Sequence, residues 1–168
     1  MASQLESFSK EQLIKYVEIL SKNILTIDGY YFLGIERRYG LERAIEIDEE
    51  AWGQYGKTEA KRIKELLKIH EGDLGSLKEA IGLIAFGPVS GIKAELDGRK
   101  LLVSITRCRP QYARVRDGKG EFPCKPVGLA HLSAFAREIN PRIKTRCVCA
   151  PPDSHPKEYY CRWEFTLD

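Results

Sequence analysis

The sequence contains no long apolar run. Nowhere in its 168 residues is there a stretch of roughly 20 apolar residues, the length that a membrane-spanning helix needs. The opening segment, MASQLESFSKEQ, also lacks the basic region followed by an apolar region that marks a secretory signal. No internal repeat or low-complexity segment is visible. These absences predict a cytoplasmic protein without a membrane partner.

An excess of charge of one sign is also missing. The 27 Lys and Arg residues and the 24 Asp and Glu residues are interspersed and leave a formal net charge of +3, which indicates no nucleic-acid partner. An apolar fraction of 43% with 30% charged residues is typical of a folded protein. A chain of this length can bury one sizeable core, so we expect a single domain over residues 1–168.

The first part of the chain, residues 1–87, has apolar side chains at helical spacing. Ser9 is a candidate N-cap for a helix beginning in FSKEQLIKYVEILSKN, and Gly40 is a candidate C-cap. A second helical stretch ends near KELLKIH, and Gly53 and Gly56 within it predict a kink or a break. A shorter helix is expected in DLGSLKEAIGLIA.

From residue 88 to residue 168 the apolar period becomes two. SGIKAELDGRKLLVSI predicts a hairpin with its turn at Asp97 and Gly98, so that Ala94 faces Leu101. CRPQYARVRDGKGEFPC reads as a loop, KPVGLAHLSAFAREINP as a helix, and RIKTRCVCA and EYYCRWEFTL as two strands. The sequence therefore predicts an α+β fold in which N-terminal helices pack with an antiparallel β-β-α-β-β sheet.

The five cysteines do not have the spacing of a secreted disulfide scaffold. A final hairpin centred on Ser154 would place Cys147 opposite Cys161 on an apolar face. Three interpretations stay open: buried apolar side chains, a reversible disulfide between those two cysteines, or ligands of zinc or another thiophilic metal. The metal ligands would be Cys108, Cys147, Cys149 and Cys161, with Cys124 as an alternative to Cys108.

Cys124 lies in EFPCKPVGLAHL, at the expected N-terminus of a helix. The helix dipole and the free backbone N–H groups there would stabilise a thiolate, which predicts a lowered thiol pKa and a candidate nucleophile. The same N–H groups could hold a substrate carboxylate. A packing role beneath the preceding loop and metal ligation are the alternatives. His131, about two turns further along, would be a poor base unless the chain bends.

Other candidate ligand-binding side chains lie elsewhere in the chain. Three arginines precede Cys124, and their forked guanidinium groups suit carboxylate or phosphate, although a solvated basic loop fits them equally well. An aspartate within the apolar stripe LTIDGYYFLG could face a pocket or bond to an arginine or tyrosine. Aromatic side chains nearby could wall a pocket between helices and sheet, or could be core. The candidates are Arg107, Arg109, Arg114, Asp28, Trp52 and His131.

Several of these segments carry a resemblance. DGYYFLGIERRYG, EIDEEAWGQYGKTEAKRIK, the run from CRPQYARV to CVCAPPD and the terminal CRWEFTL resemble an uncharacterised prokaryotic family of cytosolic proteins. That family is more distantly similar to the L-2-amino-thiazoline-4-carboxylic acid hydrolase-like proteins. The distant similarity implies opening of a small cyclic thioimidate, with Cys124, Cys161, Trp163 and Phe165 at matching positions. The strand and helix order also resembles the 4-vinyl-reductase type of binding domain, which implies architecture only.

Taken together, these patterns predict a small-molecule-binding protein. It would be either a hydrolase acting on a small carboxylated, thioimidate-like compound with Cys124 as nucleophile, or a non-catalytic binding module of the same shape. The alternative is a zinc-binding structural or regulatory protein that uses the C-terminal cysteines. The amphipathic segment EEAWGQYGKTEAKRIKELLKIH further predicts a homodimer formed through helices.

Overall fold

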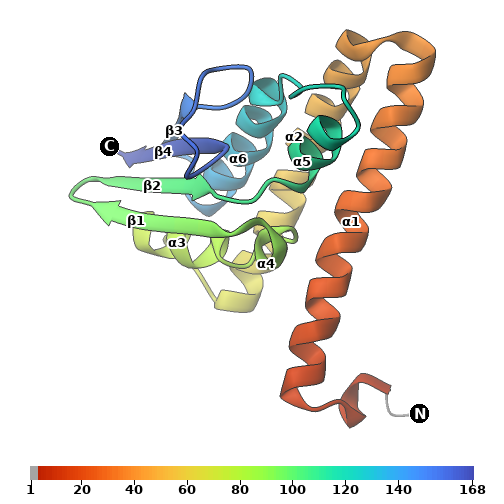
Figure 1. Cartoon of the computed structure of the whole chain (residues 1–168). Coiled ribbons are helices and arrows are strands. Elements are labelled where there is room, and N and C mark those ends of the chain that lie inside the picture. Colours follow the sequence, from red (N-terminus) through yellow and green to blue (C-terminus); the bar gives the residue numbers. More distant parts are fainter. Residues whose placement is uncertain (1–3) are drawn as a thin grey trace.

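The computed structural model describes residues 4–168. Over these residues the chain forms a short 3₁₀ turn (Gln4–Ser7), six α-helices and one four-stranded antiparallel sheet (Figure 1). The α+β prediction is therefore confirmed. In chain order the elements are α1 (Lys10–Tyr39), α2 (Leu41–Leu67), α3 (Leu74–Ile81), α4 (Gly87–Ser90), β1 (Ile92–Asp97), β2 (Lys100–Ile105), α5 (Arg109–Arg116), α6 (Lys125–Ile139), β3 (Ile143–Cys149) and β4 (Cys161–Leu167).

The two long helices begin and end where the sequence predicts. The Ser9 hydroxyl accepts a hydrogen bond from the Gln12 backbone N–H, and the Gln12 side chain accepts one from the Ser9 N–H, which completes a capping box at the start of α1. Gly40, with a φ of +88°, ends α1 and precedes α2. The chain reverses there, so α1 and α2 form an antiparallel pair (Figure 1). None of the helices described in residues 4–168 combines the length and apolarity needed to cross a membrane.

The predicted kink in α2 is wrong, because the helix is continuous through both glycines. Gly56 is buried where α2 crosses α6, and a Cβ atom there would lie 2.5 Å from the His131 carbonyl oxygen. Gly53 faces the Ala130 side chain of α6. These glycines let the two helix backbones approach closely, and the packing gained offsets a helix-propensity cost of about 1 kcal/mol for each glycine.

The four strands lie in the order β1-β2-β4-β3. The helices α3 and α6 pack on one face of this sheet, and α2 packs on the outer side of α6 (Figure 1). Aliphatic and aromatic side chains from these helices and from the inward face of the strands form the main core. Its largest fully buried members include Leu77, Ile81, Leu101, Phe135, Trp163 and Phe165.

Both hairpins form, but each has a register different from the predicted one. In the first, Ala94 pairs with Val103 and the turn lies at Gly98 and Arg99, because Gly98 adopts a φ of +58° and takes the first turn position. In the last, Cys147 pairs with Trp163. Up to Cys147 each shift moves the partner by two residues, so these side chains keep their predicted face. After Cys147 the pairing is irregular, and Cys149 pairs with Arg162.

The segment predicted as a loop before Cys124 contains a helix. Arg109–Arg116 forms α5, with Pro110 in its first turn. Proline is tolerated there because backbone N–H groups of the first turn have no acceptor within the helix. Its polar sequence gave no apolar stripe by which to recognise a helix. The structure explains the helix by packing, since Gln111 and Arg114 point inward and are buried.

Candidate functional site

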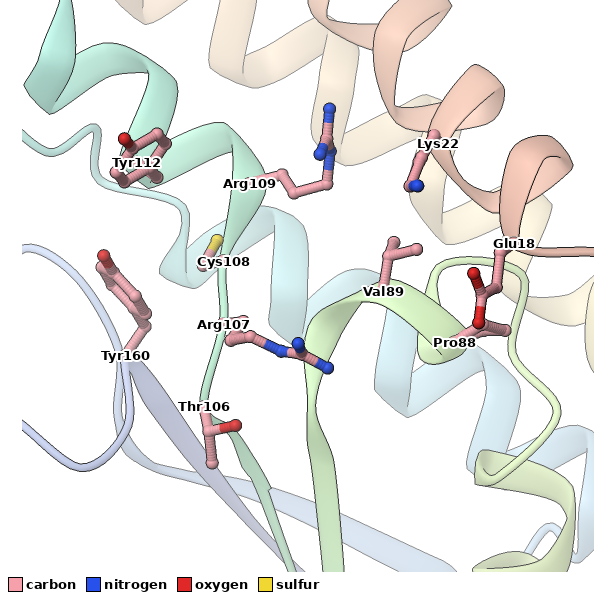
Figure 2. Close-up of a pocket in the computed structure, with 10 residues that line it drawn as sticks. All are labelled: Glu18, Lys22, Pro88, Val89, Thr106, Arg107, Cys108, Arg109, Tyr112 and Tyr160. Carbon is pink, nitrogen blue, oxygen red and sulfur yellow. The ribbon is translucent and has the colours of Figure 1, made fainter. Parts of the chain in front are cut away.

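A pocket of about 520 Å³ opens where α1, α4, α5 and the end of β2 meet (Figure 2). We term it the basic pocket. It combines charged, hydroxyl and apolar side chains from segments that are far apart in the sequence. Its lining residues are Glu18, Lys22, Pro88, Val89, Thr106, Arg107, Cys108, Arg109, Tyr112 and Tyr160.

Backbone and side-chain bonds fix the segment that carries the arginines of this pocket. After β2 the Thr106 hydroxyl donates to the Gly91 carbonyl oxygen at 2.7 Å, and the Arg107 N–H donates to the Ser90 carbonyl oxygen at 3.0 Å. Gly91 has a φ of +59°, and any Cβ there would collide with the Thr106 hydroxyl. The close approach therefore requires glycine at this position, and it holds the chain between β2 and α5 in place.

The basic pocket carries an excess of positive charge. Lys22 from α1, Arg107 from the segment after β2 and Arg109 from α5 line it, whereas Glu18 is its one acidic lining residue. Within residues 4–168, none of these three cations has an ion-pair partner. Figure 2 shows Lys22 and Arg109 reaching into the same gap between α1 and α5. Arg107 and Arg109 are exposed, and unpaired guanidinium groups beside a cavity are suited to bind a carboxylate or a phosphate.

Cys108 lies between the cationic side of the pocket and the two tyrosines, Tyr112 and Tyr160 (Figure 2). Burial raises the pKa of the Cys108 thiol to about 12, so the thiol is neutral at pH 7. A neutral thiol is a weak hydrogen-bond donor and a poor nucleophile. Together with the tyrosine hydroxyls, Cys108 can help to orient a ligand but is not poised to attack one.

Cys124 occupies the predicted position at the N-terminus of α6 but does not line the basic pocket. Its sulfur accepts a hydrogen bond from Gln111 Nε2 at 3.2 Å. Burial is the largest influence on the thiol and raises its pKa, so the predicted lowering of the pKa is wrong. Desolvation of the thiolate outweighs the helix N-terminus, because Cys124 packs with the apolar side chains near Phe122.

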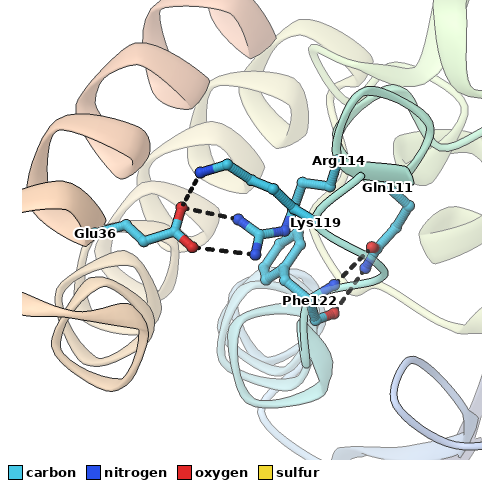
Figure 3. Close-up of polar contacts among 5 residues, drawn as sticks. All are labelled: Glu36, Gln111, Arg114, Lys119 and Phe122. Carbon is cyan, nitrogen blue, oxygen red and sulfur yellow. Dashed lines mark hydrogen bonds and ion pairs between the residues drawn. The ribbon is translucent and has the colours of Figure 1, made fainter. Parts of the chain in front are cut away.

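Arg114 is engaged within the protein and does not reach the basic pocket. Its guanidinium group forms two bonds to the Glu36 carboxylate of α1, at 2.9 and 3.1 Å, and Lys119 adds a third contact at 3.3 Å (Figure 3). The Arg114 guanidinium carbon also lies 5.9 Å from the ring centroid of Phe32 and 5.6 Å from that of Phe122. The bonds from Arg114 lower the pKa of Glu36. The structure thus assigns Arg114 to anchoring α5 on α1.

The Gln111 side chain holds the loop before Cys124 in place. Its amide accepts from the Phe122 N–H at 3.0 Å and donates to the Phe122 carbonyl oxygen at 2.9 Å (Figure 3). Gln111 is fully buried, so these two bonds provide partners for its amide and for the backbone N–H and carbonyl groups of Phe122 inside the protein. Sequence reasoning missed Gln111 and Glu36, because nothing in a single sequence shows that a polar side chain has a buried partner.

His131 lies in the interior, in a different place from the basic pocket. Its Nε2 is 3.2 Å from Glu59 Oε2, and both side chains are almost completely buried. Glu59 Oε1 accepts hydrogen bonds from the Tyr55 hydroxyl at 3.0 Å and from the Ala85 backbone N–H at 2.6 Å. Aromatic rings surround the imidazole, with Trp52 at 5.1 Å between ring centroids. The network ties α2, α6 and the segment before α4 together.

Asp28 and Trp52 meet in a second cavity of about 430 Å³ between α1 and α2, which we term the α1–α2 groove. Trp52 Nε1 donates to Asp28 Oδ1 at 2.9 Å. Asp48 lies beside Asp28, and burial together with the neighbouring charge raises the pKa of Asp48 to about 8. The aromatic pocket is therefore between two helices, not between helices and sheet as predicted. The groove is lined by Ile24, Ile27, Asp28, Tyr31, Phe32, Ile35, Ala44, Ile47, Asp48, Ala51, Trp52 and Tyr55.

The C-terminal cysteines do not form the predicted four-ligand set. In residues 4–168, no three His, Cys, Asp or Glu side chains are grouped closely enough to hold a metal ion, and all five cysteines are free thiols. Cys147 faces Trp163 across the strands, and the Trp163 indole N–H donates to the Cys161 sulfur at 3.2 Å. Burial raises the pKa of Cys147 to about 11 and raises that of Cys161 as well. These contacts are those of packed apolar side chains.

The sequence of residues 6–167 matches a protein-family model that covers almost the whole chain. The protein belongs to DUF6125. This family is described as a family of unknown function, so membership carries no activity with it. No curated protein and no solved structure matches the chain. The function of this DUF6125 member therefore has to be inferred from its own pockets and side chains.

Proposed function

We propose that this DUF6125 protein binds a small carboxylated molecule in the basic pocket. The observation that supports the proposal most is the convergence of Lys22, Arg107 and Arg109 on one cavity, without an acidic partner for any of them in the described part of the chain. The pocket's volume of about 520 Å³ lies within the range of roughly 300–1,000 Å³ that is usual for small-molecule sites.

The arrangement of the lining groups suggests how such a ligand would be held. A guanidinium fork can bind both oxygens of a carboxylate, and Lys22 adds a compact positive charge. Pro88 and Val89 offer apolar contact for the body of a small ring or chain. Glu18 could accept a hydrogen bond from an amino or hydroxyl group on the same ligand. A carboxylate with a nearby donor group therefore fits the pocket best.

The finer proposal, hydrolysis of a cyclic thioimidate, has its support in the sequence resemblance to the thiazoline carboxylate hydrolases. A substrate of that class is small and carboxylated, so it matches the charge of the basic pocket. Cys124 lies outside this pocket, however, and burial keeps its thiol protonated. Residues 4–168 contain no group of three His, Cys, Asp or Glu side chains that could bind zinc, so the structure offers no support for a zinc-based function. We therefore propose binding, without assigning Cys124 a catalytic role.

Calorimetric titration with matched acid and amide pairs tests the proposal. L-2-Amino-thiazoline-4-carboxylate and simple amino- and hydroxycarboxylates should bind, and their neutral amides should not. Arg107→Gln combined with Arg109→Gln should weaken binding at least tenfold, since a charge-assisted hydrogen bond contributes about 1.5–3 kcal/mol. Lys93→Gln combined with Arg99→Gln removes the same charge from the exposed first hairpin and should change nothing. Equal binding of acids and amides would contradict the proposal.

A second measurement separates binding from catalysis. Cys124→Ser should leave carboxylate binding unchanged, because Cys124 does not line the pocket. Iodoacetamide at pH 7 should modify Cys124 slowly in the folded protein, as expected for a thiol whose pKa is raised. Turnover of the thiazoline by the wild-type protein that disappears in Cys124→Ser would instead establish the hydrolase.

A further inference from the structure

The helix α1 carries apolar side chains at the spacing of a coiled coil. Six of them follow one another at steps of four, three, four, three and four residues, which is the alternation of d and a positions in a heptad repeat. The a positions include β-branched residues and the d positions include leucine. We term this row the α1 seam; it comprises Leu13, Val17, Leu20, Ile24, Ile27 and Tyr31.

The chain itself does not cover this seam. Val17, Leu20 and Ile27 are 49%, 47% and 51% exposed, whereas a seam residue in a finished coiled coil is buried against a partner helix. Figure 1 shows the N-terminal turns of α1 standing clear of the sheet and of α2. Contiguous exposed apolar surface of this kind marks an interaction site. This exposed apolar surface lies on α1. The segment of α2 that the sequence predicts to form the dimer packs its apolar side on α6 of the same chain instead.

The two halves of the seam have different shapes. In the first half, from residue 13 to residue 20, the rest of the chain leaves the seam side of the helix exposed. The second half, from residue 24 to residue 31, forms one wall of the α1–α2 groove, whose other wall is made by Ala44, Ile47 and Ala51 of α2. One chain thus carries both a protruding apolar helix and an apolar groove, and the two are continuous along α1.

We propose that a second copy of the chain covers the seam, with its α1 antiparallel to the first α1 and a twofold axis near residue 22. The exposed half of each helix then enters the groove half of the other. In this register an a position always meets a d position. Leu13 meets Tyr31 of the partner subunit, and Leu20 meets Ile24 of the partner subunit. Such an interface uses the same surface on both copies and closes on itself.

The polar groups beside the seam fit this arrangement. The flanking positions between residues 13 and 31 contain one charged residue, Asp28, so no rows of like charge oppose each other. A parallel pairing would leave both grooves without a helix to fill them. Glu18 and Lys22 lie on another side of α1, so the basic pocket stays open in the dimer.

The seam and the α1–α2 groove form one extended apolar surface. The seam from residue 13 to residue 31 is about 27 Å long, and a helix with its side chains is roughly 10 Å wide. Ile47, Ala51 and Tyr55 of α2 widen the contact on the groove side.

Light scattering and sedimentation equilibrium on the full chain test this proposal. Between roughly 1 and 100 μM the protein should have a mass of about 38 kDa, twice the 19.1 kDa of one chain. Leu20→Glu should give a monomer with an unchanged circular dichroism spectrum, because Leu20 is about half exposed in one chain. Leu66→Glu, at a leucine of α2 that is 72% exposed and outside the seam, should remain dimeric.

Oxidative crosslinking tests the orientation. Leu13→Cys combined with Tyr31→Cys should give a crosslinked dimer on a non-reducing gel, whereas Leu13→Cys alone should not. A crosslink with Leu13→Cys alone would mean parallel helices and would overturn the proposed arrangement. A 19 kDa species at 100 μM, or a dimer that survives Leu20→Glu, would overturn the proposal. So would binding of the monomeric wild-type chain to anionic lipid vesicles that Leu20→Glu abolishes, since a lipid surface would then cover the seam.

Discussion

In the α1–α2 groove, burial raises the pKa values of two neighbouring carboxyl groups. Asp28 and Asp48 lie side by side among apolar side chains, within hydrogen-bonding reach of each other and of the Trp52 indole N–H. Two neighbouring carboxylates cannot both ionise easily in such a place, so they retain a proton to a pH well above the usual range. Burial is the larger cause, and the neighbouring charge adds to it.

The retained proton should make the free energy of unfolding depend on pH. Because the pKa of Asp48 is about 8 in the folded protein and 3.8 ordinarily, the folded state binds the extra proton between about pH 4 and pH 8. Stability contributed by this site therefore falls as the pH rises through that window. Asp48→Asn, which resembles the protonated form, should raise the free energy of unfolding at pH 8.5 by on the order of 1 kcal/mol.

Urea denaturation at pH 5 and pH 8.5, at one protein concentration, measures the effect. The gain from Asp48→Asn should be smaller at pH 5. Glu49→Gln removes a charge from the exposed neighbouring position and should leave the pH dependence as it is. An equal gain for Asp48→Asn at both pH values would show that Asp48 ionises normally.

At the scale of elements, the close crossing of α2 and α6 organises the molecule. Gly56 lets the α6 backbone approach, and the Glu59–His131 contact then links the same two helices through buried polar groups. A few residues away, Gly128 of α6 leaves room for the Trp163 ring of β4. Glycines thus set the distance between α2 and α6 and the distance between α6 and the sheet.

Gly56→Ala should therefore destabilise the protein although alanine is the better helix former. The new Cβ would lie 2.5 Å from the His131 carbonyl oxygen, a backbone atom that cannot move aside without shifting α6. We expect a net loss of about 2 kcal/mol, since overpacking typically costs about 1–3 kcal/mol and exceeds the propensity gain. Thermal unfolding of Gly56→Ala and Gly53→Ala provides the comparison.

Gly53→Ala is the matched control one turn away. Its Cβ would lie 3.6 Å from the Ala130 side chain, which is ordinary contact, so this change should be neutral or stabilise by up to about 1 kcal/mol. If both variants behaved alike, the close crossing would not explain the glycines.

The elements themselves were largely predictable from the sequence. Apolar periodicity, the Ser9 capping box and the Gly98 turn are local signals, and the helices and strands that they indicate are present. The helix α5 was missed because its stability comes from buried Gln111 and from the bond between Arg114 and Glu36, which are 78 residues apart in the chain. Local patterns contain no information about such distant partners.

The candidate site was predictable only in part, for the same reason. Arg107 and Arg109 were recognisable by their chemistry, and both line the basic pocket. Lys22 and Glu18 were not, because α1 meets this segment only in the folded chain. For Cys124 the helix N-terminus was visible in the sequence, but the burial that raises its pKa was not.

On the scale of the whole molecule, α1 separates the two surfaces for which we propose partners. One side of the helix contributes to the basic pocket, and another carries the α1 seam. Only Ser21 and Phe32 of its 30 residues are buried, whereas α6 buries six residues in half that length. The first turns of α1 consequently depend little on the core of their own chain.

Hydrogen exchange followed by mass spectrometry should reveal this uneven support. In the monomeric Leu20→Glu variant, amides between Lys10 and Leu20 should exchange far faster than those of α6, because local opening there exposes almost no buried apolar surface. In the wild-type protein at 100 μM, the partner helix should slow exchange over the same residues at least tenfold. The amides of β2 and β4, which pair with each other in the centre of the sheet, should exchange slowly in both proteins and serve as the internal reference. If residues 10–20 of the variant were protected as strongly as α6, one chain alone would stabilise the start of α1. A second copy would then not be needed to keep these residues helical.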